Sequence, residues 1–272
     1  DLLLRFPMNT PSLRIETQAV HAGHLEPRPL GAVVTPVFQS ATFEYGGETS
    51  YHDLKYIRRN NTPNHAVLHR KLAALENAEA AVVTSSGMAA ISATLLAVLQ
   101  QGDHLLAQDR LYGGTYDLLT KDLPGLGISC TFIDGNRPAS WEQHRQERTR
   151  AIYVETMSNP LLQVADLEAV SAFARRHGLL ALIDNTFATP VNFRPSEWGF
   201  ALSIHSATKY LNGHTDLAAG AVIGSAAIVS RVTHRLNRLG ASLDPHSCFL
   251  LERGLKTLVS SASCALPSTS CR

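Results

Sequence analysis

The sequence predicts an α/β domain with a mostly parallel sheet covered by helices on both faces. Short apolar runs typical of buried strands alternate with segments of helical periodicity, and the connections between them are short. This alternation favours a parallel sheet, whose strands are shielded by the helices that join them. In such sheets a ligand lies at the carboxyl ends of the strands, so we expect the functional residues there.

Length and composition indicate a globular protein. The 272 residues, 44% of them hydrophobic, suffice for one large domain with appendages. Lys+Arg total 24 and Asp+Glu 23, so no net charge draws the chain to nucleic acid or to a membrane. The four cysteines form no Cys-x-x-Cys pair, which disfavours a zinc site and a disulfide framework. No apolar stretch is long enough to span a bilayer, and we expect a cytoplasmic protein.

The order of the predicted elements follows from the apolar patterns. Strands are expected at residues 80–84, 104–108, 128–133, 151–155, 179–183, 201–204 and 218–225. Helices are expected from residue 66, from residue 87 and after residue 115, and at residues 166–178, 228–240 and 246–258. The polar residues 134–149 are expected to form an exposed connection.

We divide the chain into four segments. Residues 1–50, rich in Pro, Gly and Thr, are predicted to be an extended N-terminal arm that packs on a neighbouring subunit. Residues 51–245 form the ligand-binding domain, and residues 246–258 begin a further long helix. Residues 259–272 are rich in Ser and Cys without periodicity, and we predict an irregular tail.

One lysine, Lys209, follows a predicted buried strand and lies among hydroxyl side chains. The chain has few lysines, so it relies on arginine for its surface charge. A partly desolvated amine is nucleophilic and suited to forming a Schiff base, while the hydroxyls of Ser206 and Thr208 can bind a phosphate. The alternative is an ordinary loop lysine whose neighbouring hydroxyls bond the backbone.

The turns after two earlier strands offer a phosphate site and a flat aromatic surface. Gly87 and Met88 begin a helix directly after a strand, where free N–H groups and the helix dipole attract an anion. Plain helix capping by Ser85 or Ser86 explains the same residues. Tyr112 is followed by two glycines that leave its ring free to lie against a flat ligand, although a packed loop residue fits equally.

Two later strands end in polar groups. Glu155 is followed closely by Asn159, and Asp184 by Thr186. A carboxylate at the end of so apolar a strand needs a partner, because an unpaired buried charge is expensive. Asp184 either pairs with a ring nitrogen that must stay protonated or caps a turn.

A further pair, Tyr56 and Arg58, lies in a turn-rich loop before the first long helix. A phenol and a guanidinium presented together can hold a phosphate, with the guanidinium as a fork-shaped donor. A solvated basic turn explains this loop equally well when it is taken alone.

Together these strand ends describe one site. An amine for an aldehyde, a carboxylate for a pyridinium, an aromatic ring that covers the ligand and phosphate donors are what pyridoxal phosphate requires. A nicotinamide site is disfavoured, because no Gly-x-Gly-x-x-Gly follows a predicted strand. A metal site made of His205, His214 and Asp216 is possible by composition, but the lysine loop explains these residues better.

The chain resembles the Cys/Met-metabolism family of pyridoxal-phosphate enzymes over residues 15–258. This family includes cystathionine γ-synthase, cystathionine β- and γ-lyases, methionine γ-lyase and the O-acylhomoserine sulfhydrylases. The motifs that carry the resemblance, in chain order, are Ser86-Gly87-Met88-Ala89-Ala90, Leu111-Tyr112-Gly113-Gly114-Thr115, Glu155-Thr156-Met157-Ser158-Asn159-Pro160, Asp184-Asn185-Thr186, and Ser206-Ala207-Thr208-Lys209-Tyr210 with Gly213-His214.

The resemblance implies the large domain of a fold type I pyridoxal-phosphate enzyme and a role for each site residue. Lys209 would attach the cofactor, Asp184 would pair with the pyridine nitrogen, and Tyr112 would stack on the ring, which makes these three the candidate catalytic residues. The other candidates are Gly87, Met88, Ser206 and Thr208 for the phosphate, Asn159 for the ring hydroxyl, Thr186 for cofactor binding, Tyr112 and Glu155 for the substrate, and Tyr56 and Arg58 for the cofactor of the adjacent subunit.

The resemblance also implies an activity and an assembly. We expect β- or γ-elimination or γ-replacement on sulfur-containing or O-acylated amino acids, in a homodimer within a homotetramer. The family continues beyond residues 253–258 into a C-terminal domain whose arginine binds the substrate carboxylate, and we expect this chain to lack that domain. The alternative is therefore a catalytically impaired fragment or subunit that binds the cofactor. Asn61-Thr62-Pro63 also departs from the family's Asn-Pro-Thr, which we expect to alter the loop more than the chemistry.

Overall fold

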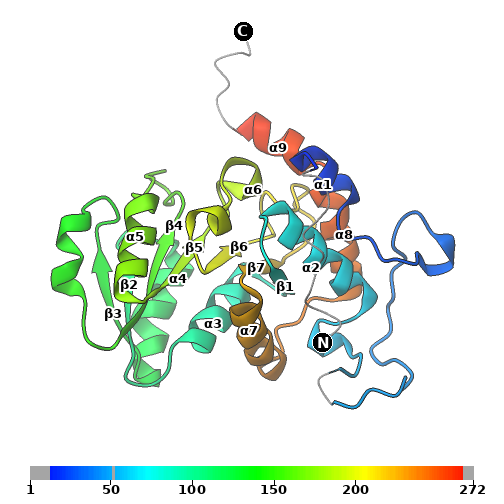
Figure 1. Ribbon diagram of the computed structural model, residues 1–272, viewed down its shortest axis with the longest axis horizontal. Coiled ribbons are helices and arrows are strands. Elements are labelled where there is room, and N and C mark those ends of the chain that lie inside the picture. The colour runs from blue at the N-terminus through cyan, green and yellow to red at the C-terminus, as the bar shows by residue number, and fades with distance from the viewer. Residues whose placement is uncertain (1–12, 51–52, 266–272) are drawn as a thin grey trace, which may run out of the picture.

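A seven-stranded sheet forms the centre of the molecule (Figure 1). The computed structural model describes residues 13–50 and 53–265. The strands, in the spatial order β1-β7-β6-β5-β4-β2-β3, are β1 (Ala80–Thr84), β2 (His104–Gln108), β3 (Ser129–Ile133), β4 (Thr149–Glu155), β5 (Leu180–Asp184), β6 (Leu202–His205) and β7 (Gly220–Gly224). Among them β7 runs antiparallel to β1 and β6, and the other pairs are parallel. The prediction of a mostly parallel sheet is confirmed, and each strand lies within two residues of its predicted bounds.

The helices also follow the predicted order. They are α1 (Ile15–His21), α2 (Pro63–Leu75), α3 (Gly87–Val98), α4 (Gly113–Asp117), α5 (Leu167–His177), α6 (Thr189–Asn192), α7 (Ala226–Leu239), α8 (Pro245–Leu255) and α9 (Leu258–Ala265). Capping residues in the sequence determine where several of these helices begin or end. The Asp166 carboxylate accepts a hydrogen bond from the Ala169 N–H at the start of α5, and Gly178 ends that helix in the left-handed conformation.

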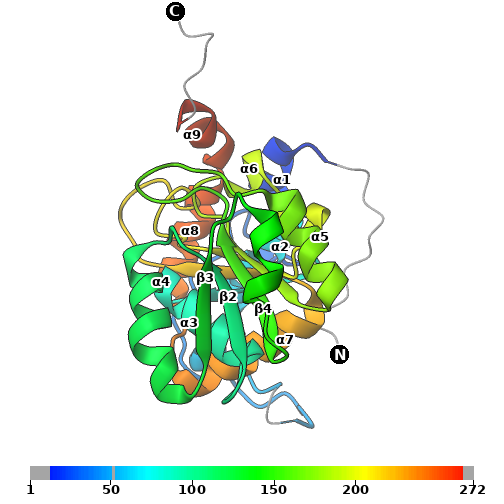
Figure 2. The same ribbon diagram turned by 90° about the vertical axis from the view of Figure 1, so that its left-hand side faces the viewer.

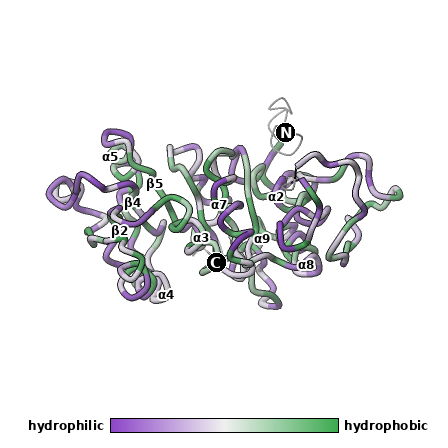
Figure 3. Tube along the Cα trace, turned by 90° about the horizontal axis from the view of Figure 1, so that it is seen from below, coloured by the Kyte–Doolittle hydropathy of each residue, from purple (hydrophilic) through white to green (hydrophobic). Residues whose placement is uncertain are grey.

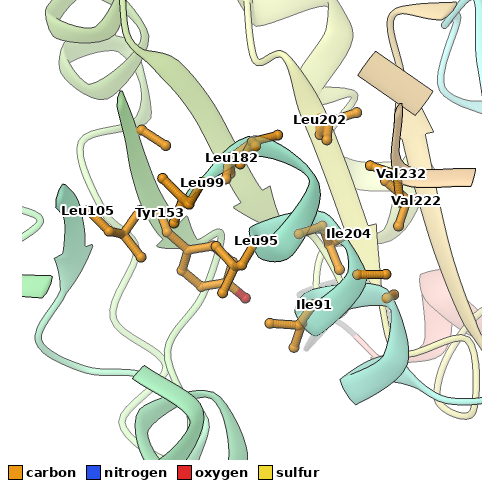
Figure 4. Close-up of a cluster of buried hydrophobic side chains, with 14 of the residues drawn as sticks. Ile91, Leu95, Leu99, Leu105, Tyr153, Leu182, Leu202, Ile204, Val222 and Val232 are labelled. Carbon is orange, nitrogen blue, oxygen red and sulfur yellow. The ribbon is translucent and has the colours of Figure 1, made fainter. Parts of the chain in front are cut away.

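Helices cover both faces of the sheet. Figure 2 shows α3 and α4 on one side of β3, β2 and β4, with α5 on the other side. The α3 face contains the largest core cluster, in which Ile91 and Leu95 of α3 pack near Tyr153, Leu182 and Ile204 of three strands (Figure 4). Helix α7 adds to this face. The expectation of helices on both faces is confirmed.

The opposite face has two smaller cores. Helices α2 and α8 pack their leucines on β1 and β7, whereas Phe173 of α5 packs with Ile152 and Ile183 of the parallel strands. Figure 3 shows hydrophobic stretches concentrated along the strands and inner helices, and hydrophilic stretches towards the periphery. No helix in the described ranges is long and apolar enough to cross a membrane.

The connection at residues 134–149 differs from the predicted exposed loop. It contains Trp141, whose side chain is 0% exposed and whose indole N–H donates to the Asp134 carbonyl oxygen at 2.8 Å. The indole also packs edge-on against Phe173 of α5, with ring centroids 5.6 Å apart. A single large apolar side chain therefore anchors a polar segment. The average polarity of that segment gave no indication of this anchor.

The predicted irregular tail, residues 259–272, is wrong in its first part. Helix α9 continues to Ala265, because Leu258 and Ala262 lie one turn apart and are both buried. Its contacts with α1 and α6 supply an environment that the Ser-rich sequence alone does not reveal. The predicted helix at residues 246–258 is interrupted after Leu255, and residues 266–272 lie outside the described part of the chain.

The predicted extended arm begins with a helix. In α1, the carbonyl oxygens of Ala19 and Val20 each accept a hydrogen bond at 3.0 Å from the fully buried Lys71 ammonium of α2. The Glu252 carboxylate of α8 lies 3.7 Å from the same ammonium. After α1 most of the chain up to residue 50 runs outside the body of the domain (Figure 1), whereas Arg59, Asn60 and Thr62, just before α2, are buried. Residues 1–12 of the predicted arm lie outside the described residues.

We predict that Trp141→Ala lowers the free energy of unfolding by about 3–5 kcal/mol, because it removes a fully buried indole and leaves a cavity. Urea unfolding followed by far-UV circular dichroism measures this change. Trp198→Ala is the matched control, since that side chain is 47% exposed and should cost about 1 kcal/mol or less. Equal losses in the two variants would contradict the anchoring role.

Candidate active site

The predicted site residues leave strands that run in the same direction. Apart from Tyr56 and Arg58, they lie at or after the ends of β1, β2, β4, β5 and β6, whereas β7, the strand that runs the opposite way, contributes none of them. The carboxyl ends of the parallel strands therefore deliver these residues to one edge of the sheet.

Asp184 ends β5 and has its carboxylate oriented by the turn that follows. Its Oδ1 accepts hydrogen bonds from the Thr186 N–H at 3.0 Å and from the Thr186 hydroxyl at 2.5 Å. Burial raises the pKa of Asp184, while the two Thr186 hydrogen bonds and the nearby His205 lower it. Its Oδ2 accepts no hydrogen bond from another described residue and is free to pair with a ligand N–H.

Thr186 joins this carboxylate to the lysine loop. Its hydroxyl donates to Asp184 and accepts a hydrogen bond at 2.8 Å from the Ser206 N–H, the first residue after β6. The same loop begins with a turn in which the Lys209 N–H donates to the Ser206 carbonyl oxygen at 3.1 Å. The acid at the end of β5 and the backbone of the loop that carries Lys209 therefore belong to one hydrogen-bonded unit.

Lys209 itself presents a free amine. Its side chain is exposed, in contrast to the partly desolvated amine expected from the sequence, and it forms no hydrogen bond or ion pair with another described residue. The neighbouring Thr208 hydroxyl is occupied, because it donates to the Ala219 carbonyl oxygen at 3.2 Å and accepts from the Ala219 N–H at 3.0 Å. Thr208 thereby ties the lysine loop to the chain that enters β7.

The N-terminus of α3 lies against the lysine loop. A Cβ added to Gly87 would lie 2.8 Å from the Ser206 Cβ, so glycine permits this approach. Ser86 caps the helix by accepting a hydrogen bond from the Ala89 N–H at 3.1 Å. Capping and anion binding are thus compatible here, since a cap satisfies one N–H and the other first-turn N–H groups stay available.

Tyr112 and Met88 lie beside each other above this helix end. A Cβ on Gly114 would lie 2.7 Å from the Tyr112 Cε1 and 3.0 Å from the Met88 Sδ, so Gly114 makes room for both side chains. The Tyr112 side chain is 50% exposed, as a ring that covers a flat ligand must be. Its position depends on Glu155, whose Oε1 accepts a hydrogen bond from the Tyr112 N–H at 2.6 Å.

Glu155 ends β4 and is almost completely buried. Burial raises its pKa to about 8, a change that the Tyr112 N–H opposes and the charge of Asp184 reinforces. The backbone of Asn159, in the exposed loop after β4, lowers this pKa slightly. Glu155 therefore lies beneath Tyr112 and holds the loops that follow β2 and β4.

Tyr56 and Arg58 are not part of this group. The Arg58 guanidinium donates to the Asn237 carbonyl oxygen of α7 at 2.6 Å and lies over the Tyr56 ring, 5.3 Å from its centroid. Both line a cleft of about 400 Å³ formed with residues 42–48 of the arm. Within the described residues they form no hydrogen bond to the side chains at the carboxyl ends of β4, β5 and β6. After them, Thr62 and Pro63 begin α2.

The residues weighed as a metal site are separated. His205 is fully buried, whereas His214 and Asp216 are exposed in the loop before β7. Across the described parts of the chain, no group of three or more His, Cys, Asp or Glu side chains could hold a metal ion.

Sequence reasoning missed a buried polar cluster behind the site. Glu76, Asn185, Ser203 and His205 share hydrogen bonds on the face of the sheet opposite Asp184. A signal was present, because Ser203 and His205 alternate with apolar residues in a strand buried on both faces. Glu76 carried no such signal, since it follows the last leucine of an ordinary helix.

This arrangement defines an α/β protein with a site for an aldehyde-bearing aromatic cofactor. The free Lys209 amine, the free Oδ2 of Asp184 and the helix end at Gly87 match the aldehyde, the ring nitrogen and the phosphate of pyridoxal phosphate. The residues present therefore fit the group that the sequence predicted.

Comparison with known proteins identifies the family. The Cys/Met metabolism PLP-dependent enzyme family matches residues 16–262, so the chain belongs to it. The chain is 39% identical to a probable cystathionine gamma-synthase of Herpetosiphon aurantiacus, over 89% of this chain and 76% of that protein. It is 41% identical to the L-methionine gamma-lyase of Pseudomonas deceptionensis, over 89% of this chain and 63% of that enzyme.

A solved structure confirms the fold. The chain superposes on cystathionine gamma-lyase from Lactobacillus plantarum complexed with L-serine, with a TM-score of 0.84 and 33% identity, over 91% of this chain and 65% of that one. The predicted family, the α/β fold of its large domain and the pyridoxal phosphate cofactor are thereby confirmed. Against most of these relatives the chain spans just under two thirds of their length.

We predict that Glu155→Gln removes a pH dependence of stability. The folded-state pKa of about 8 lies above the value of 4.5 for a free carboxyl, so the protonated carboxyl stabilises the fold at low pH. This stabilisation is lost as the pH rises to about 8, by about 3 kcal/mol between pH 5 and pH 8. Urea unfolding at several pH values measures the difference between the variant and the unmodified chain.

Glu147→Gln is the control for this measurement, because Glu147 is exposed and should leave the pH dependence unchanged. A constant difference between Glu155→Gln and the unmodified chain from pH 5 to pH 8 would show that Glu155 is already ionised at pH 5.

Proposed function

We propose that this chain is a pyridoxal-phosphate-dependent enzyme of sulfur amino-acid metabolism. Its reaction would be β- or γ-elimination, or γ-replacement, on a sulfur-containing or O-acylated amino acid. The relatives support this class, since they are named as a cystathionine synthase, cystathionine lyases and methionine lyases. The single structural observation that carries the proposal is the Thr186 hydroxyl, which links Asp184 to the start of the lysine loop.

Lys209 and Asp184 have the central roles in this proposal. Bound pyridoxal phosphate supplies an electron sink for the bonds at the substrate Cα. Lys209 would hold the cofactor through Nζ, and the same atom would accept the proton from the substrate Cα. Asp184 would keep a proton on the ring nitrogen, because its carboxylate is buried, oriented by Thr186 and free at Oδ2.

The remaining residues bind and orient. We assign Gly87 and Met88, at the start of α3, and Ser206 to binding of the cofactor phosphate. We assign Thr208 to this phosphate-binding group as well, because it fixes the loop that carries Ser206 and Lys209. Tyr112 covers the ring, and Asn159 lies on the loop that would reach the ring hydroxyl. We place Tyr112 on the substrate side as well, with Glu155 acting through its hydrogen bond to the Tyr112 backbone.

We further propose a homotetramer built from dimers that share their sites. Tyr56 and Arg58 are held on α7 beside the arm and make no bond to the described residues around Asp184, which is compatible with a role in the partner's site. The arm exposes large apolar side chains, including Leu30, Val33 and Tyr45, which favours a covering subunit. The cytoplasm is the location that suits such a metabolic enzyme, and Cys130 and Cys248 are both free thiols.

The first test is the visible spectrum of the purified chain with pyridoxal phosphate, before and after borohydride, with the labelled peptide identified by mass spectrometry. We predict a yellow adduct that borohydride fixes on Lys209 and that Lys209→Ala abolishes. Asp184→Ala should keep part of the binding and lower turnover by about a hundredfold or more, because the ring nitrogen loses its proton-holding partner. Lys121→Ala is the control, since this lysine is exposed and paired with Asp117.

Turnover separates the enzyme from the alternative of a catalytically impaired cofactor-binding chain. Steady-state assays with cystathionine, methionine and an O-acylhomoserine should show product formation with at least one substrate. A fixed adduct in the Lys209→Ala variant would refute the role of Lys209. Near-normal turnover of Asp184→Ala would refute the role of Asp184, and an adduct without turnover on any substrate favours the impaired chain.

Shared sites predict complementation between inactive variants. Arg58→Ala and Lys209→Ala should each be nearly inactive alone. When the two are unfolded together and refolded as a mixture, a mixed dimer has one site with both Lys209 and the partner's Arg58. We expect about a quarter of the unmodified activity to return, because half of the dimers are mixed and each has one intact site. The mixture of Arg58→Ala with Asp184→Ala should regain activity in the same way. The mixture of Lys209→Ala with Asp184→Ala should stay inactive, because both residues belong to the same subunit's site. If neither mixture that contains Arg58→Ala regains activity, the shared site is contradicted.

A further inference from the structure

A buried cluster lies on the face of the sheet opposite Asp184. The Glu76 Oε1 accepts hydrogen bonds from the His205 Nε2 at 2.6 Å, from the Ser203 hydroxyl at 2.9 Å and from the Asn185 side-chain amide at 3.4 Å. Glu76 and His205 are both 0% exposed. Three donors from the ends of two strands therefore converge on one oxygen that a helix supplies.

The position of Glu76 is unfavourable for a carboxylate. It is the C-terminal cap of α2, where the negative end of the helix dipole repels negative charge. It is also fully buried, and within residues 13–50 and 53–265 no lysine or arginine forms an ion pair with it. The Glu76 Oε2 and the His205 Nδ1 form no hydrogen bond with the described residues. A residue that costs stability in these ways needs a reason other than stability.

Alternation along the strands places this cluster directly behind the candidate active site. Leu182 and Ile204 belong to the core on the α3 face, and Asp184 follows Leu182 at the spacing that keeps a side chain on the same face. Asn185 and His205 therefore point to the other face. Asp184 pairs with Ile204 across the sheet, so His205 is the residue next to its strand partner.

Hydrogen bonds extend the cluster to the ends of three neighbouring strands. The Asn185 side chain accepts a hydrogen bond from the Thr156 hydroxyl at 2.8 Å and donates to the Phe193 carbonyl oxygen at 2.9 Å. The Thr156 N–H donates to the Asp184 carbonyl oxygen at 3.0 Å, and the Asn185 N–H donates to the Ile204 carbonyl oxygen at 2.8 Å. The ends of β4, β5 and β6 are thus tied together from behind.

We propose that Glu76 and His205 are positioning residues for the candidate active site. Their hydrogen bond holds the ends of β5 and β6 in the register that places Asp184, Thr186 and the Ser206–Lys209 loop on the cofactor side. The structural part of this inference stands on the contacts alone, whereas its consequence for turnover rests on the proposed function.

His205 also acts on Asp184 electrostatically. The ionisable groups around Asp184 are Glu155 and Tyr153 of β4 and His205 of β6, and α3 has no ionisable side chain on this face. Burial raises the pKa of Asp184, whereas the two Thr186 hydrogen bonds and, after them, the nearby His205 lower it. Removing His205 therefore removes one of the influences that lower the pKa of Asp184.

The first experiment needs no cofactor. Hydrogen–deuterium exchange by mass spectrometry is compared for the unmodified full chain, Glu76→Gln and His205→Asn, on peptides that contain the amides of Thr156, Asn185 and Ser206. We expect exchange at these amides to rise about tenfold or more in both variants, because the strand ends open locally more often. The double variant should resemble the single variants, since either change breaks the same bond.

His104→Asn is the matched control. His104 is also a fully buried imidazole of this sheet, held between Thr149 and Thr131 at 2.8 and 2.9 Å, but it lies at the amino end of β2. It should leave exchange at the three amides unchanged. If Glu76→Gln and His205→Asn do not fold, Ser203→Ala removes one donor from Glu76 and provides the comparison. Unchanged exchange in the variants that fold overturns the positioning role.

The second experiment uses the chain loaded with pyridoxal phosphate. In Glu76→Gln and His205→Asn we expect kcat to fall about tenfold with KM within about twofold of the unmodified value. In His205→Asn the acidic limb of the pH profile, and of the pH titration of the cofactor's visible band, should move to higher pH, because one influence that lowers the pKa of Asp184 is lost. His104→Asn should move neither.

The two experiments separate the possible failures. If the unmodified chain binds no cofactor, the proposed function fails, and the exchange measurement still decides the positioning role. If the chain binds the cofactor and both variants keep the unmodified kcat, pH profile and spectrum, the influence of the pair on the active site is refuted.

Discussion

Two carboxyl groups buried at neighbouring strand ends, Glu155 and Asp184, constrain the rest of the site. A buried carboxylate is costly unless hydrogen-bond donors surround it. The loops after β2 and β5 provide those donors, through the Tyr112 N–H for Glu155 and through Thr186 for Asp184. The backbone that satisfies the two acids is the same backbone that places Tyr112 and Thr186. The geometry of the site therefore follows from the need to provide two buried carboxyl groups with hydrogen-bond donors from the protein.

The sequence predicted this face of the sheet because its signals are local. Apolar runs located each strand, and polar residues after a run marked a strand end, as with Asp184 directly after one run and Lys209 in the loop after another. The parallel direction of the strands then required these residues to meet at one edge. Resemblance to a family added the particular roles, which single polar residues in loops could not define.

The parts that the sequence did not predict depend on contacts between distant residues. Glu76 and His205 are 129 positions apart and meet only when α2 packs on the sheet. Trp141 lies in a polar segment and is buried by α5, a later helix. Helix α9 forms on a Ser-rich sequence because α1 and α6 bury its inner face. In each case burial by a partner outweighs the local composition.

The two faces of the sheet contribute in different ways to the positions of the site residues. On the α3 face, the loops after β2 and β5 provide the donors for Glu155 and Asp184. On the opposite face, Asn185 and His205 lie in buried strand ends and both hydrogen-bond Glu76, while the Thr156 hydroxyl donates to Asn185. Because each strand alternates its side chains, one short segment such as Asp184-Asn185 contributes to both faces. A substitution on the face opposite α3 therefore acts on the α3 face through a single peptide unit. Buried residues that contact no ligand can in this way still affect the geometry of the site.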